Sequence, residues 1–134
     1  MGPGLAHPMH KATGLYAHIT WGTWRRKPFV LAGDVPVIGA AIVATAGRHK
    51  VRVHAQAVLT DHVHIVLSFL PDASISAFVR DAKSESARRV NEMRPSALRW
   101  GRGFYAGSLS WSHVRAARVY VANQQLRHPD KVPR

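Results

Sequence analysis

Two histidines one residue apart, His62 and His64, are the clearest sign of chemistry in this sequence. They fall within residues 58–69, an alternating stretch in which a β-strand is predicted. Side chains alternate between the two faces of a strand, so both imidazoles are expected to point the same way. Neutral imidazole is a common ligand for divalent metal ions, and a strand holds two of them at a fixed separation. The pair indicates a metal site, although two solvated histidines on a sheet face would look the same.

The last predicted helix, residues 111–128, carries a second set of reactive side chains. His113, Tyr120 and Gln124 recur at spacings that place them on one helical face. A tyrosine on an inner face is most simply part of the core, with its hydroxyl hydrogen-bonded. A buried carboxamide is harder to explain because it needs a polar partner. If this face lies over the histidine pair, Tyr120 becomes a candidate nucleophile and Gln124 a candidate oxygen ligand for a metal ion. His113, on the same face, could assist the reaction.

Hydrophobic periodicity predicts the elements that must hold these residues in place. Candidate N-caps precede the three helices: Asp34, Ser74, and either Ser110 or Ser112. The predicted order is strand, helix, strand, strand, helix, strand, helix, over residues 15–23, 35–50, 51–59, 62–69, 75–91, 103–110 and 111–128.

Polar residues alternate along the strand that precedes the histidine pair. Arg52, His54 and Gln56 lie at every second position of residues 51–59. A short link joins this strand to the histidine strand, so the two are expected to form a hairpin. The three side chains are then predicted to line the same sheet region as the histidines, although an exposed sheet face would give the same pattern.

The length and composition restrict the kinds of protein that this chain can be. A chain of 134 residues suits one domain with a real core. No apolar run reaches the length of a membrane span, and the first residues lack the apolar segment of a secretory leader. The absence of cysteine excludes disulfides and thiolate metal sites and fits the reducing cytoplasm.

The net charge points to an anionic partner. The sequence has 19 Lys and Arg against 7 Asp and Glu, a formal net charge of +12. Such an excess attracts polyanions. No basic amphipathic segment suits a membrane anchor, so nucleic acid is the expected partner.

Two groups of cations are candidate DNA contacts. Arg25, Arg26 and Lys27 follow the first strand close to Trp21 and Trp24, and could clamp a phosphate while a base stacks on an indole. A run of charges is also common on an ordinary solvated surface.

The second group lies on the helix predicted over residues 75–91. Beside its apolar stripe this helix carries Arg80, Lys83, Arg88 and Arg89. A face this basic suits a phosphodiester backbone, with plain solvated surface as the alternative.

Four segments together resemble a known family. They are DHVH at 61–64, KSESARR at 83–89, RWGRGFY at 99–105 and YVANQ at 120–124. In this order they resemble the single-tyrosine HUH transposases, more narrowly the type named after insertion sequence 200, with REP-associated tyrosine transposases as near relatives. The likeness covers about residues 15–127. It implies a transposase domain over residues 14–128, followed by a short tail over 129–134. Residues 1–13 lack hydrophobic periodicity and are predicted to be a disordered leader.

The resemblance implies a fold and a function. The expected fold is a single α+β domain with helices packed on a central antiparallel sheet, related to ferredoxin-like and RRM-like folds. The implied activity is cleavage and rejoining of single-stranded DNA, at hairpins, through a 5′-phosphotyrosine. By position, Tyr120 matches the nucleophile, and His62, His64 and Gln124 match the ligands of Mg²⁺ or Mn²⁺. The resemblance also implies a homodimer that works in the cytoplasm, often with the tyrosine helix of one subunit completing the other's site.

Two other functions remain open at this point. A non-catalytic module that binds DNA or RNA hairpins, such as a domesticated transposase, would need the same basic charge and aromatic residues. The set formed by His62, His64, Tyr120 and Gln124 argues against it, because simple binding does not require these residues. Metal-dependent hydrolysis by an activated water is the third possibility, and it would survive replacement of Tyr120 by phenylalanine.

Overall fold

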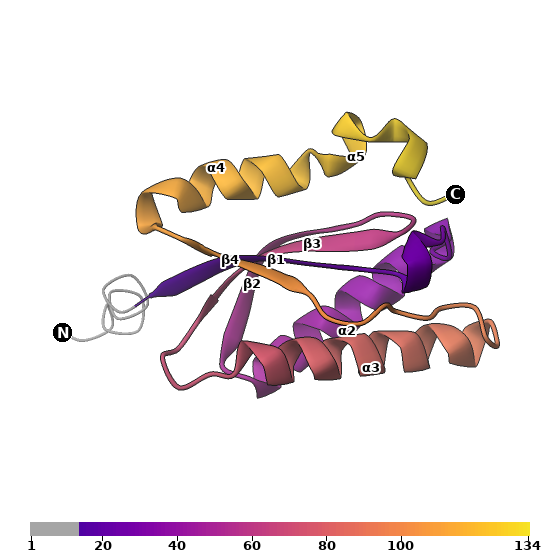
Figure 1. The fold of residues 1–134 in the computed structure, drawn as a ribbon, viewed down its shortest axis with the longest axis horizontal. Helices are drawn as coiled ribbons and strands as arrows, with labels where there is room; N and C mark the ends of the chain where they lie inside the picture. Colours follow the sequence, from indigo (N-terminus) through magenta and orange to yellow (C-terminus); the bar gives the residue numbers. More distant parts are fainter. Residues whose placement is uncertain (1–13) are drawn as a thin grey trace.

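Four strands form one antiparallel sheet. The computed structural model describes residues 14–134, and the leader predicted over 1–13 lies outside these residues. The strands are β1 (Leu15–Gly22), β2 (Val51–Val58), β3 (His62–Phe69) and β4 (Tyr105–Leu109). Their order in the sheet is β2-β3-β1-β4 (Figure 1). The strand predicted over 103–110 begins later, because Gly103 adopts a left-handed φ of 74°.

Helices cover both faces of the sheet. The long helices are α2 (Val35–Arg48) and α3 (Ile75–Met93) on one face, and α4 (Trp111–Ala122), followed by the short α5 (Gln124–Arg127), on the other (Figure 1). Three 3-10 turns complete the chain: η2 (Trp24–Arg26), η3 (Ala32–Asp34) and η4 (Pro129–Lys131). The predicted α+β architecture is confirmed. None of the helices in the described part of the chain combines the length and the apolar character that a membrane span requires.

The alternation of β3 divides the core in two. Val63, Ile65 and Leu67 are fully buried and belong to the larger cluster, packed with residues of α2 and α3. Burying a side chain of this kind contributes about 1.5–3 kcal/mol. On the other face, a smaller cluster includes Val114 and Val121 of α4. This smaller cluster holds α4 over the face from which the histidines project.

The pairing of β2 with β3 is irregular. The register shifts between Val53 and Ala55, which leaves His54 as a bulge. A shift of one residue reverses the alternation for every residue that follows. Gln56 therefore faces α2, where its amide donates to the carbonyl of Gly39 at 3.4 Å. The prediction that Gln56 shares a face with the histidine pair is wrong.

The helix caps follow the prediction only in part. Ser74 caps α3, because its hydroxyl accepts a hydrogen bond from the backbone nitrogen of Ala77 at 3.1 Å. Asp34 precedes α2 but makes no side-chain cap to it. Its carboxylate accepts from the backbone nitrogen of Leu31 at 2.8 Å and pairs with Arg94 beyond α3. This ion pair joins the ends of two helices, a contact that no local pattern predicts.

The single helix predicted over 111–128 is wrong, because the chain breaks at Asn123 into α4 and α5. Asparagine is a weak helix former. Ser110 occupies the N-cap position of α4 without a side-chain cap bond, and its hydroxyl instead lies 2.5 Å from Nδ1 of His113. The break separates Tyr120, which stays partly exposed, from the buried Gln124.

Candidate active site

The histidine pair projects from β3 toward α4. His62 and His64 lie on the face opposite Val63 and Ile65, as the alternation of a strand predicts. Their Nε2 atoms are 3.0 Å apart, and each residue is only 9% exposed. The structure confirms that the two imidazoles share one face and brings them close enough to act on one ligand.

Asp61 fixes the orientation of His62. Its Oδ1 lies 2.6 Å from Nδ1 of His62, and its Oδ2 accepts a hydrogen bond from Lys131 at 2.6 Å. Burial opposes the charge of Asp61, but the hydrogen bonds from Lys131 and His62 and the charge of Arg26 lower its pKa to about 2. Arg26 also approaches the same Nδ1, at 3.1 Å, but the shorter contact with an ionised carboxylate decides the tautomer. His62 therefore carries its proton on Nδ1 and keeps a lone pair on Nε2.

His18 of β1 fixes the orientation of His64. Its Nε2 lies 2.9 Å from Nδ1 of His64, and the two rings stack with centroids 5.1 Å apart. Burial, followed by the neighbouring charges of His62, His18, His128 and Arg26, lowers the pKa of His64 to about 4. Burial also lowers the pKa of His62 and of His18. All three histidines are neutral at pH 7, the form that binds metal ions.

Tyr120 lies beside the histidines of its own chain. Its ring centroid is 6.2 Å from that of His64 and 6.2 Å from that of His18, with an edge-on geometry to both. The guanidinium of Arg127 lies 4.9 Å from the centroid of the tyrosine ring. The residue is 39% exposed, and within residues 14–134 no hydrogen bond holds its hydroxyl. A substrate can therefore reach this oxygen.

Gln124 is buried with one polar atom unsatisfied. The residue is 1% exposed, and its amide nitrogen donates to the backbone carbonyl of Tyr120 at 3.2 Å. Its Oε1 has no hydrogen-bond partner among the described residues. An unsatisfied buried acceptor costs about 1–3 kcal/mol. An oxygen kept in this state is available to a ligand.

Two imidazoles and a carboxamide oxygen could together hold a divalent cation. Residues 14–134 contain no group of three His, Cys, Asp or Glu side chains that could hold a metal ion, so the two histidines would need another donor. The unsatisfied Oε1 of Gln124, four residues after Tyr120, is the donor that the sequence suggests. Two nitrogens 3.0 Å apart match adjacent corners of an octahedron with bonds of about 2.1 Å. The residues present therefore suit Mg²⁺ or Mn²⁺.

The first group of predicted DNA contacts lies next to the histidines. Arg25, Arg26 and Lys27 are exposed, and Arg25 and Arg26 both have a left-handed φ of 54°. Gly22 permits this turn, since a Cβ there would lie 2.7 Å from Cδ of Arg26. Arg26 reaches back to Asp61 at 3.4 Å. The middle residue of this basic run, Arg26, is therefore part of the site.

The predicted stacking role of Trp21 is wrong. Trp21 is 2% exposed and belongs to the larger core, where it contacts Trp100 edge to face. Trp24 is partly exposed, and the guanidinium groups of Arg25 and Arg99 each lie 4.4 Å from its ring centroid. A base could stack on Trp24 only in place of one of these cations.

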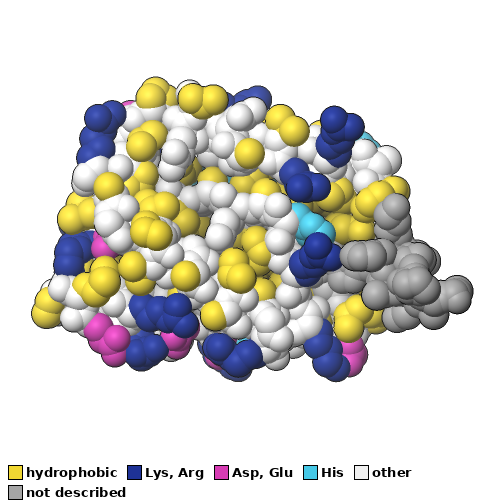
Figure 2. Space-filling view, turned by 180° about the vertical axis from the view of Figure 1, so that it is seen from behind, with side chains coloured by type: hydrophobic (Ala, Val, Ile, Leu, Met, Phe, Trp, Pro, Cys, Tyr) yellow, Lys and Arg dark blue, Asp and Glu magenta, His cyan; other side chains and the backbone are white. Residues whose placement is uncertain are grey.

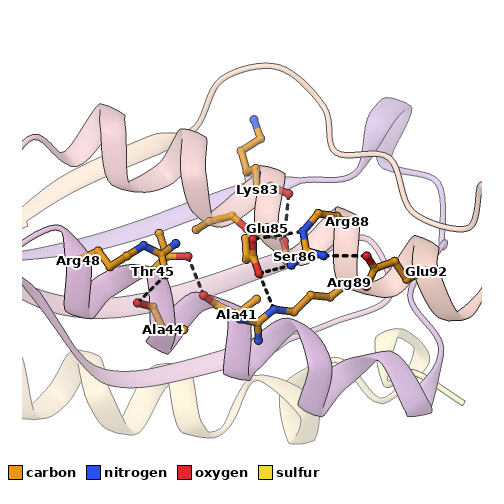
Figure 3. A network of polar contacts seen from close by, with 11 residues as sticks. Ala41, Ala44, Thr45, Arg48, Lys83, Glu85, Ser86, Arg88, Arg89 and Glu92 are labelled. Carbon is orange, nitrogen blue, oxygen red and sulfur yellow. Dashed lines mark hydrogen bonds and ion pairs between the residues drawn. The ribbon is translucent and has the colours of Figure 1, made fainter.

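The second group of predicted DNA contacts lies on α3, across the sheet from Tyr120 (Figure 1). Figure 3 shows Arg88 placed between Glu85 and Glu92, with distances of 2.7 and 2.8 Å. Arg89 also pairs with Glu85 at 2.7 Å. Lys83 donates to the backbone carbonyl of Gly101 at 2.6 Å. All three cations already have partners within the chain.

Three residues that contact the site are not among those predicted from the sequence. His18 and Arg127 are described above, and the third is Lys131 in the segment predicted as a tail. The carbonyl of Lys131 accepts a hydrogen bond from the backbone nitrogen of Thr60 at 2.9 Å, which ties this segment to the hairpin before His62. The alternation of β1 places His18 on one face, but only the strand order reveals that this face adjoins His64.

The chain is similar to known proteins over most of its length. The family described as "Transposase IS200 like" matches residues 11–124. A protein from Deinococcus radiodurans R1 assigned as a transposase has a similar structure, with 25% identity, a TM-score of 0.66, and coverage of 83% of this chain and 91% of that chain. A REP-associated tyrosine transposase bound to a REP hairpin shares the fold at 17% identity, with a TM-score of 0.66 and coverage of 87% and 68%. A comparison with curated protein sequences finds no match.

Proposed function

This chain belongs to the IS200-like transposase family, and we propose that it cleaves and rejoins single-stranded DNA through a covalent bond to Tyr120. The observation that carries the proposal is the position of Tyr120, whose ring lies 6.2 Å from that of His64 in the same chain. A module that only binds nucleic acid has no need of an accessible tyrosine beside two neutral, oriented histidines.

The proposed cleavage is a nucleophilic displacement at phosphorus. The hydroxyl oxygen of Tyr120 forms a bond to the scissile phosphorus, and the bond from phosphorus to the 3′ oxygen breaks. The tyrosine loses its proton and the departing 3′ oxygen gains one. The products are a 5′-phosphotyrosine and a free 3′-hydroxyl. Attack by another 3′-hydroxyl reverses the step and releases Tyr120, so strands are rejoined without ATP.

The surrounding residues have separate roles in this proposal. His62, His64 and Gln124 would hold Mg²⁺ or Mn²⁺, which supplies positive charge for the phosphate oxygens as the displacement proceeds. Asp61 keeps the Nε2 lone pair of His62 directed at the shared ligand. His18 would do the same for His64 when its Nε2 accepts a hydrogen bond from Nδ1 of His64. Fixing both rings in advance avoids the cost of ordering them during the reaction.

A hairpin-containing single strand is the proposed substrate. A structural neighbour with the same fold is bound to a REP hairpin, which supports a hairpin for this chain as well. We propose a homodimer as the active form and the cytoplasm as its location. The position of Tyr120 over the histidines of its own chain supports a site completed within one subunit.

Two groups of cations are proposed to contact this DNA. Arg25, Arg26 and Lys27 would bind phosphates next to the histidines, where their side chains are exposed. Lys83, Arg88 and Arg89 would contact a more distant part of the substrate on α3. They would do so only by sharing or releasing their present partners.

The experiment that tests this function uses labelled hairpin DNA with single-stranded flanks, taken from the sequence around the gene. Purified protein is incubated with it in Mn²⁺ or in EDTA and analysed on a denaturing gel. The expected result is a protein-linked DNA band that requires Mn²⁺ and disappears in Tyr120→Phe. Tyr105→Phe is the matched control, since Tyr105 is exposed on β4 and should leave the band unchanged.

Two results would support the other functions. A tight, salt-sensitive complex without a covalent band on any tested hairpin would favour a binding module. Cleavage that persists in Tyr120→Phe would favour hydrolysis by a metal-activated water.

A further inference from the structure

The segment formed by α4, which carries Tyr120, and the following α5 is basic and lacks acidic residues. From residue 111 to residue 127 the sequence contains Arg115, Arg118 and Arg127 and no acidic residue. All three arginines are exposed. On the face shown in Figure 2, most acidic side chains lie along the lower edge, beside basic ones.

No ion pair in the described part of the chain joins a carboxylate to these three arginines. The sequence has seven acidic residues. Six of them form ion pairs with other partners: Asp34, Asp61, Asp72, Asp81, Glu85 and Glu92. The seventh, Asp130 of η4, follows Arg127 by three residues but forms no ion pair with it. The arginines of α3 in Figure 3 show the contrast, since both Arg88 and Arg89 are neutralised by Glu85 on their own helix. The positive charge around Tyr120 is therefore left for an external anion.

These arginines border hollows that open beside Tyr120. A hollow of about 520 Å³ is lined by Arg115, Tyr120, Asn123 and Arg127, among others. A second hollow, of about 380 Å³, is lined by Arg115 and Arg118 and reaches His54 of β2. Arg115 lines both. Val119 is also shared, so the two hollows adjoin along α4, and together they are termed the α4 groove.

The chemistry of the groove suits a phosphodiester chain. Guanidinium groups bind phosphate oxygens through two parallel hydrogen bonds, and no acidic residue lines either hollow to repel them. Val119 lines both hollows and is 54% exposed. An exposed apolar side chain between cations can contact an unpaired base, whose faces are not covered by neighbours as they are in a duplex.

We propose that this groove binds the backbone of single-stranded DNA beside the scissile phosphate, with Arg127 and Arg115 each contacting a phosphate. Arg127 lies next to the reacting residue, since its guanidinium is 4.9 Å from the centre of the Tyr120 ring. Arg118 extends the path toward β2. The inference rests on the proposed function only for the role of Tyr120. Binding of the strand by the arginines is a separate property.

The test measures binding without chemistry. In the Tyr120→Phe background, a fluorescent single-stranded oligothymidine is titrated at several salt concentrations. Arg127→Ala and Arg115→Ala are each expected to weaken binding on the order of tenfold. Each should also reduce the slope of log Kd against log salt by about 0.7, the effect of one lost phosphate contact on a single strand. Arg127→Lys should recover part of the loss because it keeps the charge.

Arg48→Ala is the matched control. Arg48 is exposed at the end of α2, and its side chain donates a hydrogen bond to the carbonyl of Ala44 in its own helix, at 3.5 Å (Figure 3). Its loss should leave both the affinity and the salt slope close to the parent values. Equal effects of Arg48→Ala, Arg115→Ala and Arg127→Ala would overturn the inference, because binding would then follow net charge alone.

The covalent assay separates this inference from the proposed function. A wild-type protein that forms the Tyr120 adduct, together with unchanged salt slopes in both arginine variants, would overturn the groove and leave the function standing. Reduced slopes without any adduct in the wild type would support the groove and count against the proposed nucleophile. Equal thermal stability of all variants shows that the comparison is between folded proteins.

Discussion

The Nε2 atoms of His62 and His64 face each other at 3.0 Å, while the other nitrogen of each ring is held by a different partner. Asp61 accepts a hydrogen bond from Nδ1 of His62, and Nε2 of His18 lies 2.9 Å from Nδ1 of His64. Two lone pairs at this distance repel unless a proton or a cation lies between them. The two Nε2 atoms are therefore placed where they could bind one cation together.

The histidine pair is expected to bind Mn²⁺ in the absence of DNA. His62→Ala or His64→Ala should weaken this binding by about 100-fold or more, because each removes a direct ligand. Electron paramagnetic resonance of free Mn²⁺ measures the affinity. His113→Ala is the control, since His113 is exposed at the start of α4 and bonds Ser110. If His62→Ala, His64→Ala and His113→Ala all bind Mn²⁺ with the same affinity, the metal ion does not bind at the histidine pair.

His18→Ala is expected to weaken Mn²⁺ binding by about 10- to 100-fold without removing a ligand, because His64 loses the partner that orients its ring. His18→Gln should recover part of the affinity through its carboxamide oxygen. The same resonance measurement applies. A partner with a merely structural role would lower thermal stability and leave the Mn²⁺ affinity of the folded protein unchanged.

Gln124→Met is expected to separate stability from metal binding. Methionine has a similar length and removes the unsatisfied Oε1, so the free energy of unfolding without metal should stay the same or rise by up to about 2 kcal/mol. The affinity for Mn²⁺ should fall in the same variant. Urea denaturation and metal titration measure the two effects. The variant also loses the hydrogen bond from the amide nitrogen to the carbonyl of Tyr120. A large loss of stability would mean that this bond outweighs the cost of the unsatisfied Oε1.

The lowered pKa values of the histidines predict a specific pH dependence. The pKa of His64 is lowered to about 4, against an ordinary value of 6.5 in the unfolded chain. Between these values the unfolded chain binds the extra proton, so the stability of the metal-free protein should fall as pH drops from 6.5 toward 4. Mn²⁺ binding should persist at pH 6. The lowered pKa of Asp61, about 2 against an ordinary value of 3.8, affects stability only at lower pH.

Thermal denaturation across this pH range checks the prediction. In His64→Asn the slope of stability against pH between 4 and 6.5 should become smaller, because one of the titrating groups is gone. The remaining slope comes from His62 and His18, whose pKa values are also lowered. An unchanged slope would contradict the burial of a neutral His64.

The sequence predicted the parts of this site that depend on local periodicity. The spacing of His62 and His64 predicts that they share one face of a strand, and both project from the same face of β3. The helix that carries Tyr120 was also predicted. The family resemblance supplied the roles of Tyr120 and Gln124, which periodicity alone left open.

Other features depend on contacts between distant segments. The bulge at His54 turned Gln56 toward α2, although the sequence alternates without interruption. Trp21 is in the core because β1 lies inside the sheet, between β3 and β4. The neighbour that His18 finds in His64 depends on the order of the strands, which no local pattern contains. Each of these outcomes required the tertiary structure.

The measurement that tests the central claim most directly is the location of the covalent bond. The wild-type protein is incubated with hairpin DNA and Mn²⁺, digested with nuclease and trypsin, and analysed by mass spectrometry. The chain has three tyrosines, so the site can be assigned without ambiguity. We predict that the peptide spanning residues 119–127 carries the remaining nucleotide on Tyr120. A nucleotide on Tyr16 or Tyr105, or DNA cleaved without any adduct, would contradict the account.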